Sequence, residues 1–189
     1  MSLLSQPLTI VPMYLSSAQA RQQSGLMAQS KRSMSYFDAI TAEGDVLATF
    51  HMGQGIVIKG QSEMWRVLKQ PNIESLMQPG MSTANAAASI FKGTTNLFGR
   101  VCRITVGVDR LGGYVLEGNG WRGSRIRRAT DGVRVANLYA EGDPPEIFHL
   151  DPARAKPEIP MAVAYLVLYF LLEREIRHGS WISRPTSSL

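Results

Sequence analysis

The sequence predicts a mainly β protein, a closed antiparallel β-barrel that encloses a hydrophobic C-terminal helix. Short runs rich in β-branched and aromatic residues recur along most of the chain with turn residues between them, as in barrels and sandwiches. Residues 160–172 then form an unbroken apolar run of 13 residues, which indicates a helix that must be enclosed on every side. Strands wrapped round such a helix bury the helix and the inner face of the sheet together, and closure removes the sheet edges.

The expected strands follow one another at hairpin spacing. Asp131-Gly132 separates two runs of β-branched residues, which is a strong local signal for a hairpin. Leu111-Gly112-Gly113 is expected to be another turn. The predicted strands cover residues 8–15, 35–40, 46–50, 55–59, 64–68, 100–108, 114–117, 124–129, 133–140 and 146–150.

The chain length of 189 residues suits a single domain with a sizeable core. We expect an N-terminal strand and flexible polar segment over residues 1–33, a barrel over 34–178 and a tail over 179–189. Residues 71–96 show no sustained period, so a long mobile loop is expected there. The first 37 residues contain no acid, and a flexible tail explains this better than a targeting signal with so few basic residues.

The apolar run is expected to be the barrel's central helix, over about residues 157–178. Pro157 and Pro160 suit the first turn of a helix, and His178 suits the last. A bilayer span needs about 20 apolar residues, whereas 13 residues cover only about 20 Å. Glu173 then ends the run with a charge, so a core helix is preferred to a membrane span.

Residues 118–123 (GNGWRG) match the spacing of a dinucleotide-binding loop. That loop must leave a strand and open a helix whose N–H groups face the phosphates. The residues that follow, 124–130, read as a strand instead. We therefore interpret the glycines as turn glycines and expect no nucleotide cofactor.

No catalytic or metal-binding pattern stands out. His51, His149 and His178 are far apart in sequence, and none has the spacing of a metal ligand pair. The single cysteine, Cys102, lies in a predicted strand, which favours a structural thiol over a nucleophile. We expect no enzyme activity, no catalytic residue, no metal and no cofactor.

Arginine is the one concentrated chemical feature, in a chain with a formal net charge of +5. Arg125 and Arg127 share one strand face, with Arg122 and Trp121 in the preceding turn, while Arg128 points to the other face. Guanidiniums on one face can hold a phosphorylated headgroup through forked hydrogen bonds. The alternative is an outer barrel face whose charges are simply solvated.

The order of these motifs resembles the LURP-one-related and phospholipid-scramblase-like proteins of the tubby C-terminal superfamily. The resemblance spans roughly residues 33–178 and depends on the run from Tyr114 to Gly118, the segment 131–138 (DGVRVANL), the hairpin at 43–47 and the apolar helix ending near Ile176. The scramblase branch's Pro-rich N-terminus and cysteine cluster are absent, and the basic pair of the tubby phosphoinositide site cannot be placed.

The resemblance and the arginines together imply a non-enzymatic tubby-like barrel. We expect it to bind anionic phospholipid or phosphoinositide headgroups, or to act as an adaptor, in the cytoplasm and at the periphery of a membrane. A protein-interaction or structural module without a lipid role is one alternative, and a scramblase-like lipid-handling protein is another. Nucleic acid is not an expected partner, because no aromatic-interleaved strand motif accompanies the arginines. The oligomeric state is left open.

Overall fold

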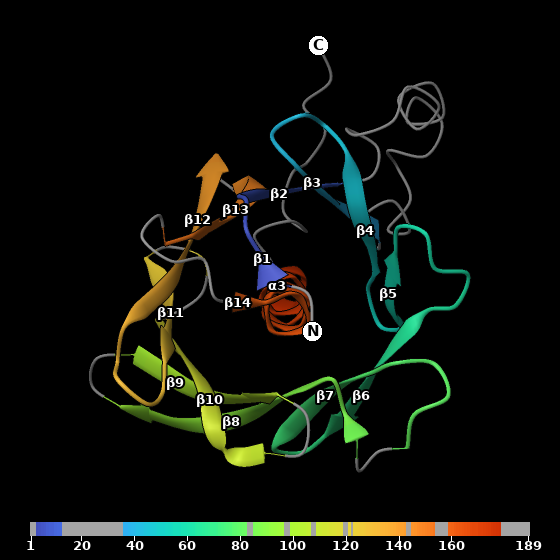
Figure 1. Ribbon diagram of the computed structural model, residues 1–189. Helices are drawn as coiled ribbons and strands as arrows, with labels where there is room; N and C mark the ends of the chain where they lie inside the picture. The colour runs from blue at the N-terminus through green and yellow to red at the C-terminus, as the bar shows by residue number, and fades with distance from the viewer. Residues whose placement is uncertain are drawn as a thin grey trace.

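The structure is a computed structural model that describes residues 3–12, 36–82, 85–96, 99–106, 109–118, 121, 123–142, 145–153 and 159–178. In these residues, twelve strands form a closed barrel around one long helix (Figure 1). Each strand pairs antiparallel with the next along the chain, and the last pairs with the first to close the ring. The expected fold class, a mainly β barrel that encloses a hydrophobic C-terminal helix, is confirmed.

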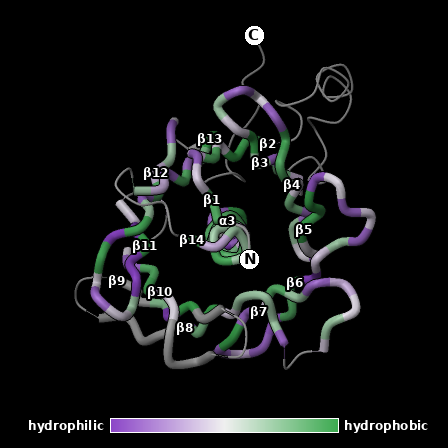
Figure 2. Tube along the Cα trace, in the orientation of Figure 1, coloured by the Kyte–Doolittle hydropathy of each residue, from purple (hydrophilic) through white to green (hydrophobic). Residues whose placement is uncertain are grey.

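The barrel strands, in chain order, are β2 (Leu8–Pro12), β3 (Tyr36–Ile40), β4 (Val46–His51), β5 (Gly55–Ile58), β6 (Trp65–Gln70), β7 (Ile73–Met77), β8 (Ala88–Asn96), β9 (Gly99–Val106), β10 (Asp109–Gly118), β11 (Ser124–Arg128), β12 (Arg134–Gly142) and β13 (Pro145–Pro152). Their inward side chains alternate with outward ones, as the two-residue period of a strand requires. In β6, for example, Trp65 and Val67 are buried, whereas Arg66 and Leu68 are exposed. Hydrophobic and hydrophilic residues are accordingly interspersed along the strands of the wall (Figure 2).

The central helix, α3 (Met161–His178), lies along the barrel axis (Figure 1). Every residue from Ala162 to Leu172 is buried, so all faces of this segment pack against the barrel wall. One such contact is the edge-on packing of Phe50 of β4 on Tyr165, with ring centroids 6.0 Å apart. No helix within the described residues is long and apolar enough to span a membrane.

A second, two-stranded sheet lies at the start of the helix. It consists of β1 (Leu3–Leu4) and β14 (Ile159–Pro160), which pair antiparallel. Leu4 and Ile159 are buried against the core. The backbone before α3 is thus extended, and the helix begins at Met161 rather than near residue 157.

Three sequence-based expectations about the layout were wrong. Residues 71–96 are not one long loop, because they contain β7 and β8. Small polar residues interrupt the apolar pattern of both strands: Ser75 and Ser89 hydrogen-bond at 2.8 Å across the pair. Residues 111–113 are part of β10, in a stretch where its register with β9 shifts. The barrel also starts at β2 rather than at residue 34. Segments 13–35 and 179–189 lie outside the described residues.

Candidate anion-binding face

Two of the predicted arginines, Arg125 and Arg127, lie on the outer wall of the barrel, in strand β11. In β11, Ser124 and Ile126 are buried, so the alternate residues Arg125 and Arg127 point away from the core. Their side chains are 47% and 36% exposed, respectively, which leaves both accessible to a ligand. The predicted common face of these two residues is confirmed by a shared partner, because both guanidiniums contact the same oxygen of Glu117.

The barrel brings two further arginines into line with Arg127. Directly opposite residues of paired strands share a face, at Cα separations of about 5 Å. Arg127 lies opposite Val115 of β10, and Val115 lies opposite Arg103 of β9. On the other side, Arg127 lies opposite Arg134 of β12. Both additional arginines are exposed.

A second cross-strand row runs parallel to the first, through Arg125. Here Arg125 lies between Glu117 of β10 and Asn137 of β12. Arg125 Nε donates a hydrogen bond of 2.7 Å to Glu117 Oε2. Asp151 of β13 lies opposite Asn137 and marks the edge of the arginine-rich area.

We call Arg103, Glu117, Arg125, Arg127 and Arg134 together the β9–β12 face. Four guanidiniums and one carboxylate give it a formal charge of +3. Within the described part of the chain, no carboxylate lies within ion-pair distance of Arg103 or Arg134. Such a concentration of one sign on an exposed wall produces a positive potential that attracts anions.

The hairpin beside this face confirms the predicted Asp-Gly turn. Gly132 has a φ of 69°, which a residue with a side chain rarely adopts. Asp131 accepts a hydrogen bond of 3.0 Å from the Val133 N–H, and its carboxylate lies 3.3 Å from Arg128 Nε. Arg128 therefore has its own anionic partner and does not contribute to the face as its neighbours do.

Trp121 is not part of the face, contrary to the prediction. Its side chain is only 2% exposed, and its ring lies 4.6 Å from that of Phe148, centroid to centroid. The large apolar ring gains more from covering the core than from exposure in a turn, which the sequence spacing alone does not reveal. It cannot reach a headgroup. Arg122 lies outside the described residues.

The GNGWRG segment joins two strands, β10 and β11, as predicted. Gly118 ends β10 with a φ of 130°, and a Cβ placed on it would lie 2.3 Å from Ser124 Oγ. Gly118 is therefore needed for close packing of the chain where it leaves the strand. The helix that a dinucleotide loop requires does not follow, because β11 begins at Ser124.

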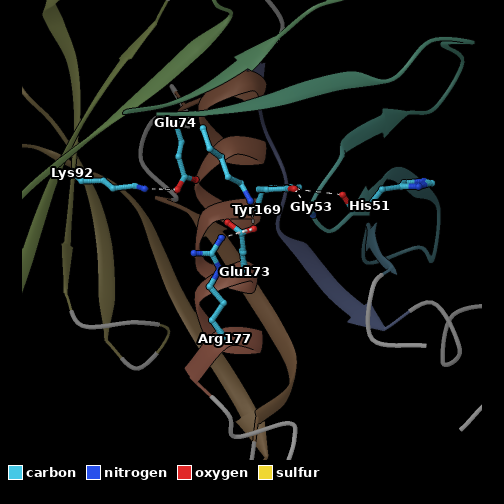
Figure 3. A network of polar contacts seen from close by, with 8 residues as sticks. His51, Gly53, Glu74, Lys92, Tyr169, Glu173 and Arg177 are labelled. Atoms are coloured by element: carbon cyan, nitrogen blue, oxygen red, sulfur yellow. Dashed lines mark hydrogen bonds and ion pairs between the residues drawn. The ribbon is translucent and has the colours of Figure 1, made fainter. Parts of the chain in front are cut away.

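A second polar cluster lies inside the barrel, at the C-terminal end of α3 (Figure 3). In the barrel wall, Lys92 Nζ lies 2.7 Å from Oε1 of Glu74, whose side chain is only 5% exposed. Between wall and helix, Lys69 forms an ion pair with Glu173, which also lies 3.2 Å from Arg177 Nη2. These ion pairs join β6 to the helix and β7 to β8.

Tyr169 connects the same end of the helix to the β4–β5 turn. Its hydroxyl accepts a hydrogen bond of 2.7 Å from the Gly53 N–H, and Lys69 Nζ lies 5.7 Å from its ring centroid (Figure 3). Burial, with the charges of Glu173 and Glu74, raises the pKa of Tyr169 to about 12, although hydrogen bonds from the turn backbone oppose the shift. Burial alone raises the pKa of Tyr165 to about 12.

Each acid of this cluster pairs with at least one base, Glu74 with Lys92 and Glu173 with both Lys69 and Arg177. The cluster fixes the rotation and depth of α3 rather than presenting groups to a ligand. The described residues contain no group of three or more His, Cys, Asp or Glu side chains that could hold a metal ion. Cys102 is buried in β9, as expected for a structural thiol.

Arg103 and Arg134 belong to the concentration of arginines that the sequence shows, but neither they nor Glu117 were predicted as members of the face. Only cross-strand register brings them to Arg127. A search for charged residues at even spacing along every predicted strand would have found the candidates, but not their pairing.

Comparisons with known proteins do not identify a family for this chain. No family model matches the chain, and no curated protein matches it. A solved structure of an Arabidopsis thaliana protein is similar to it, with 11% sequence identity, coverage of 89% of this chain and 91% of the other, and a TM-score of 0.42. At that level the likeness carries no inference about function.

Proposed function

We propose that this protein is a non-enzymatic, tubby-like barrel that binds anionic phospholipid headgroups at a membrane surface through the β9–β12 face. The observation that carries the proposal is the cross-strand alignment of Arg103, Arg127 and Arg134 beside Arg125, with Glu117 as the single carboxylate within the face. Arginines spread over the three strands β9, β11 and β12 make a broad contact surface, which suits a membrane. The resemblance of the motif order to LURP-one-related and scramblase-like proteins supports the same reading.

The energetics agree with a peripheral, reversible contact. Each basic residue close to an anionic membrane contributes about 1 kcal/mol. A face with a formal charge of +3 therefore supplies about 3 kcal/mol, which is enough for recruitment but not for permanent anchoring. The attraction fades over a Debye length of about 8 Å at physiological salt, so binding should weaken as salt is added. A cytoplasmic location with peripheral membrane contact follows as part of the proposal.

The test is co-sedimentation with phosphatidylcholine vesicles that contain or lack phosphatidylserine. Changing Arg125, Arg127 and Arg134 together to Gln should weaken binding at low salt about a hundredfold, because about 3 kcal/mol is lost. The melting temperature should stay close to that of the wild type, since all three side chains lie on the outer wall.

Single changes provide matched controls. Arg134→Gln should weaken binding about fivefold, whereas Arg66→Gln should leave it unchanged, because exposed Arg66 lies on β6, remote from the face in the barrel order. Arg128→Gln should have a smaller effect than Arg134→Gln, since Asp131 already pairs with Arg128. A wild-type protein that does not co-sediment with anionic vesicles at low salt would overturn the proposal and favour a protein-interaction module instead.

A further inference from the structure

Glu117 holds two arginines of the face by the inner ends of their guanidinium groups. Arg125 Nε donates a hydrogen bond to Glu117 Oε2 at 2.7 Å, and Arg127 Nε lies 3.1 Å from the same oxygen. The second contact is an ion pair rather than an aligned hydrogen bond, because Arg127 Nε is buried without a hydrogen-bond partner. The two Nε atoms are consequently within about 6 Å of each other.

This geometry leaves the outer nitrogens of the guanidinium groups for a ligand. A guanidinium has five N–H donors, and only one of them is on Nε. Arg127 Nη1 also makes a long hydrogen bond of 3.4 Å to the Gly132 carbonyl, which helps to orient its side chain. With respect to the described residues, the terminal Nη groups of Arg125, together with Nη2 of Arg127, retain their donors, and both side chains are more than one-third exposed.

We propose that Arg125 and Arg127 form a preformed clamp for one phosphate monoester, with Glu117 as its positioning residue. This inference rests on the proposed function and specifies the ligand class of the same face. A monoester has three free oxygens and a charge of about −1.5 to −2, whereas a phosphate diester has two free oxygens and a charge of −1. Two fixed guanidiniums side by side provide enough donors for the third oxygen, so the clamp distinguishes a monoester from a diester.

Glu117 exerts two opposing effects on such a ligand. Its negative charge repels a dianion at about 6 Å, which lowers the affinity for that dianion by roughly a factor of ten in water. Glu117 also holds the arginine side chains in place before the ligand arrives. The ligand then does not have to restrict their rotamer freedom, which raises its affinity by up to about thirtyfold for each arginine. Because two arginines are held, positioning outweighs repulsion for a ligand that engages both. For a ligand attracted only by the net charge of the face, positioning brings no gain, and Glu117 only lowers the affinity by repulsion.

The opposite signs of these effects allow a decisive test with vesicles. Binding is measured to phosphatidylcholine vesicles containing either phosphatidic acid, a monoester, or phosphatidylserine, a diester, at matched surface potential. In Glu117→Gln, binding to phosphatidylserine should rise about fivefold, because one repelling charge is lost. The preference for phosphatidic acid over phosphatidylserine should fall about tenfold.

The matched control is Glu63→Gln, which makes the same charge change at an exposed acid on the β5–β6 turn, far from the arginines in the barrel order. It should leave the lipid preference unchanged. Arg125→Lys is a second variant that keeps the charge and the fold but removes the Nε contact to Glu117. It should lower the preference for phosphatidic acid while leaving phosphatidylserine binding within about twofold.

Binding of soluble glycerol 3-phosphate tests whether the clamp recognises a phosphate monoester on a lipid or one free in solution. If it binds the wild type as tightly as the vesicles do, and Glu117→Gln weakens this binding, the clamp serves soluble phosphate monoesters. If it fails to compete with phosphatidic acid vesicles, the clamp serves a lipid headgroup. Equal strengthening of both lipids in Glu117→Gln would overturn the clamp but leave the anionic face intact, whereas a wild type that binds neither lipid and no glycerol phosphate would overturn both.

Discussion

The buried ion pair between Glu74 and Lys92 provides a direct test of how the barrel interior tolerates charge. Glu74 lies on the inner face of β7, and its Oε1 is 2.7 Å from Lys92 Nζ. Its second oxygen, Oε2, is buried without a hydrogen-bond partner among the described residues. Lys69, its neighbour across the strand pair, is engaged by Glu173. Changing Lys92 to Met therefore removes the main compensation for a carboxylate that is almost fully buried.

The expected cost follows from the exposure of the two partners. Breaking a buried ion pair by removing one partner typically costs 3–5 kcal/mol. The Lys92 side chain is 23% exposed, so water can reach the site in part, and we expect the low end, about 3 kcal/mol. Glu74→Met should cost less, about 1 kcal/mol, because the longer and more exposed lysine can turn its ammonium towards water. The double variant should lie close to the wild type, since an apolar pair of similar volume avoids the desolvation penalty.

Urea unfolding followed by circular dichroism measures these free energies as a double-mutant cycle. The expected coupling between the two residues is about 4 kcal/mol, because the single changes cost about 3 and about 1 kcal/mol and the double change costs close to nothing. The slopes of the unfolding transitions should stay unchanged. A Lys92→Met protein that unfolds within about 1 kcal/mol of the wild type would refute the reasoning, because the carboxylate would then have another source of compensation.

Two further predictions concern stability. Gly118→Ala should destabilise the fold by more than about 1 kcal/mol in urea unfolding, because φ is 130° and the new Cβ would lie 2.3 Å from Ser124 Oγ. Gly44→Ala is the control for backbone strain alone, because Gly44 also has a positive φ but has open space around it, and this change should cost less. Alkaline pH should also destabilise the protein. The pKa values of Tyr165 and Tyr169 are raised to about 12 in the fold, against 10.0 when unfolded. The contribution of the two neutral hydroxyls to the free energy of unfolding is therefore complete below pH 10 and is lost as pH rises towards 12. Tyr165→Phe should reduce this loss, and a Tyr165→Phe protein whose free energy of unfolding falls between pH 10 and pH 12 as steeply as that of the wild type would contradict the assignment.

The fold was predictable because its two strongest patterns are physically unambiguous. An apolar run from Pro160 to Leu172 must be enclosed, and a closed β wall is an enclosure that short strands can build. Two strands that failed to show in the sequence, β7 and β8, have small polar residues within their apolar pattern, Ser75 and Ser89. There, pairing with neighbouring strands rather than local propensity stabilises the extended backbone.

The candidate site was predictable only along a single strand. Alternation placed Arg125 and Arg127 on one face, as the structure shows. The cross-strand partners Arg103 and Arg134, as well as the position of Glu117, depend on register, which no pattern in one segment specifies. The error at Trp121 has a related cause, since its burial depends on contact with Phe148 in a strand that is distant in sequence.

Packing also explains why a binding function is to be sought on the outer wall. Residues 162–172 of α3 and the inward side chains of the strands fill the barrel together, and most of them are less than 2% exposed. A ligand inside would have to displace part of this core, at the cost of the apolar burial that stabilises the fold. The outer positions of β9 to β12 do not help to fill the core, because Arg103 and Arg134 are exposed and can be changed without opening a cavity. Variants of the face should therefore change binding without changing stability, and variants of the inner wall should do the opposite.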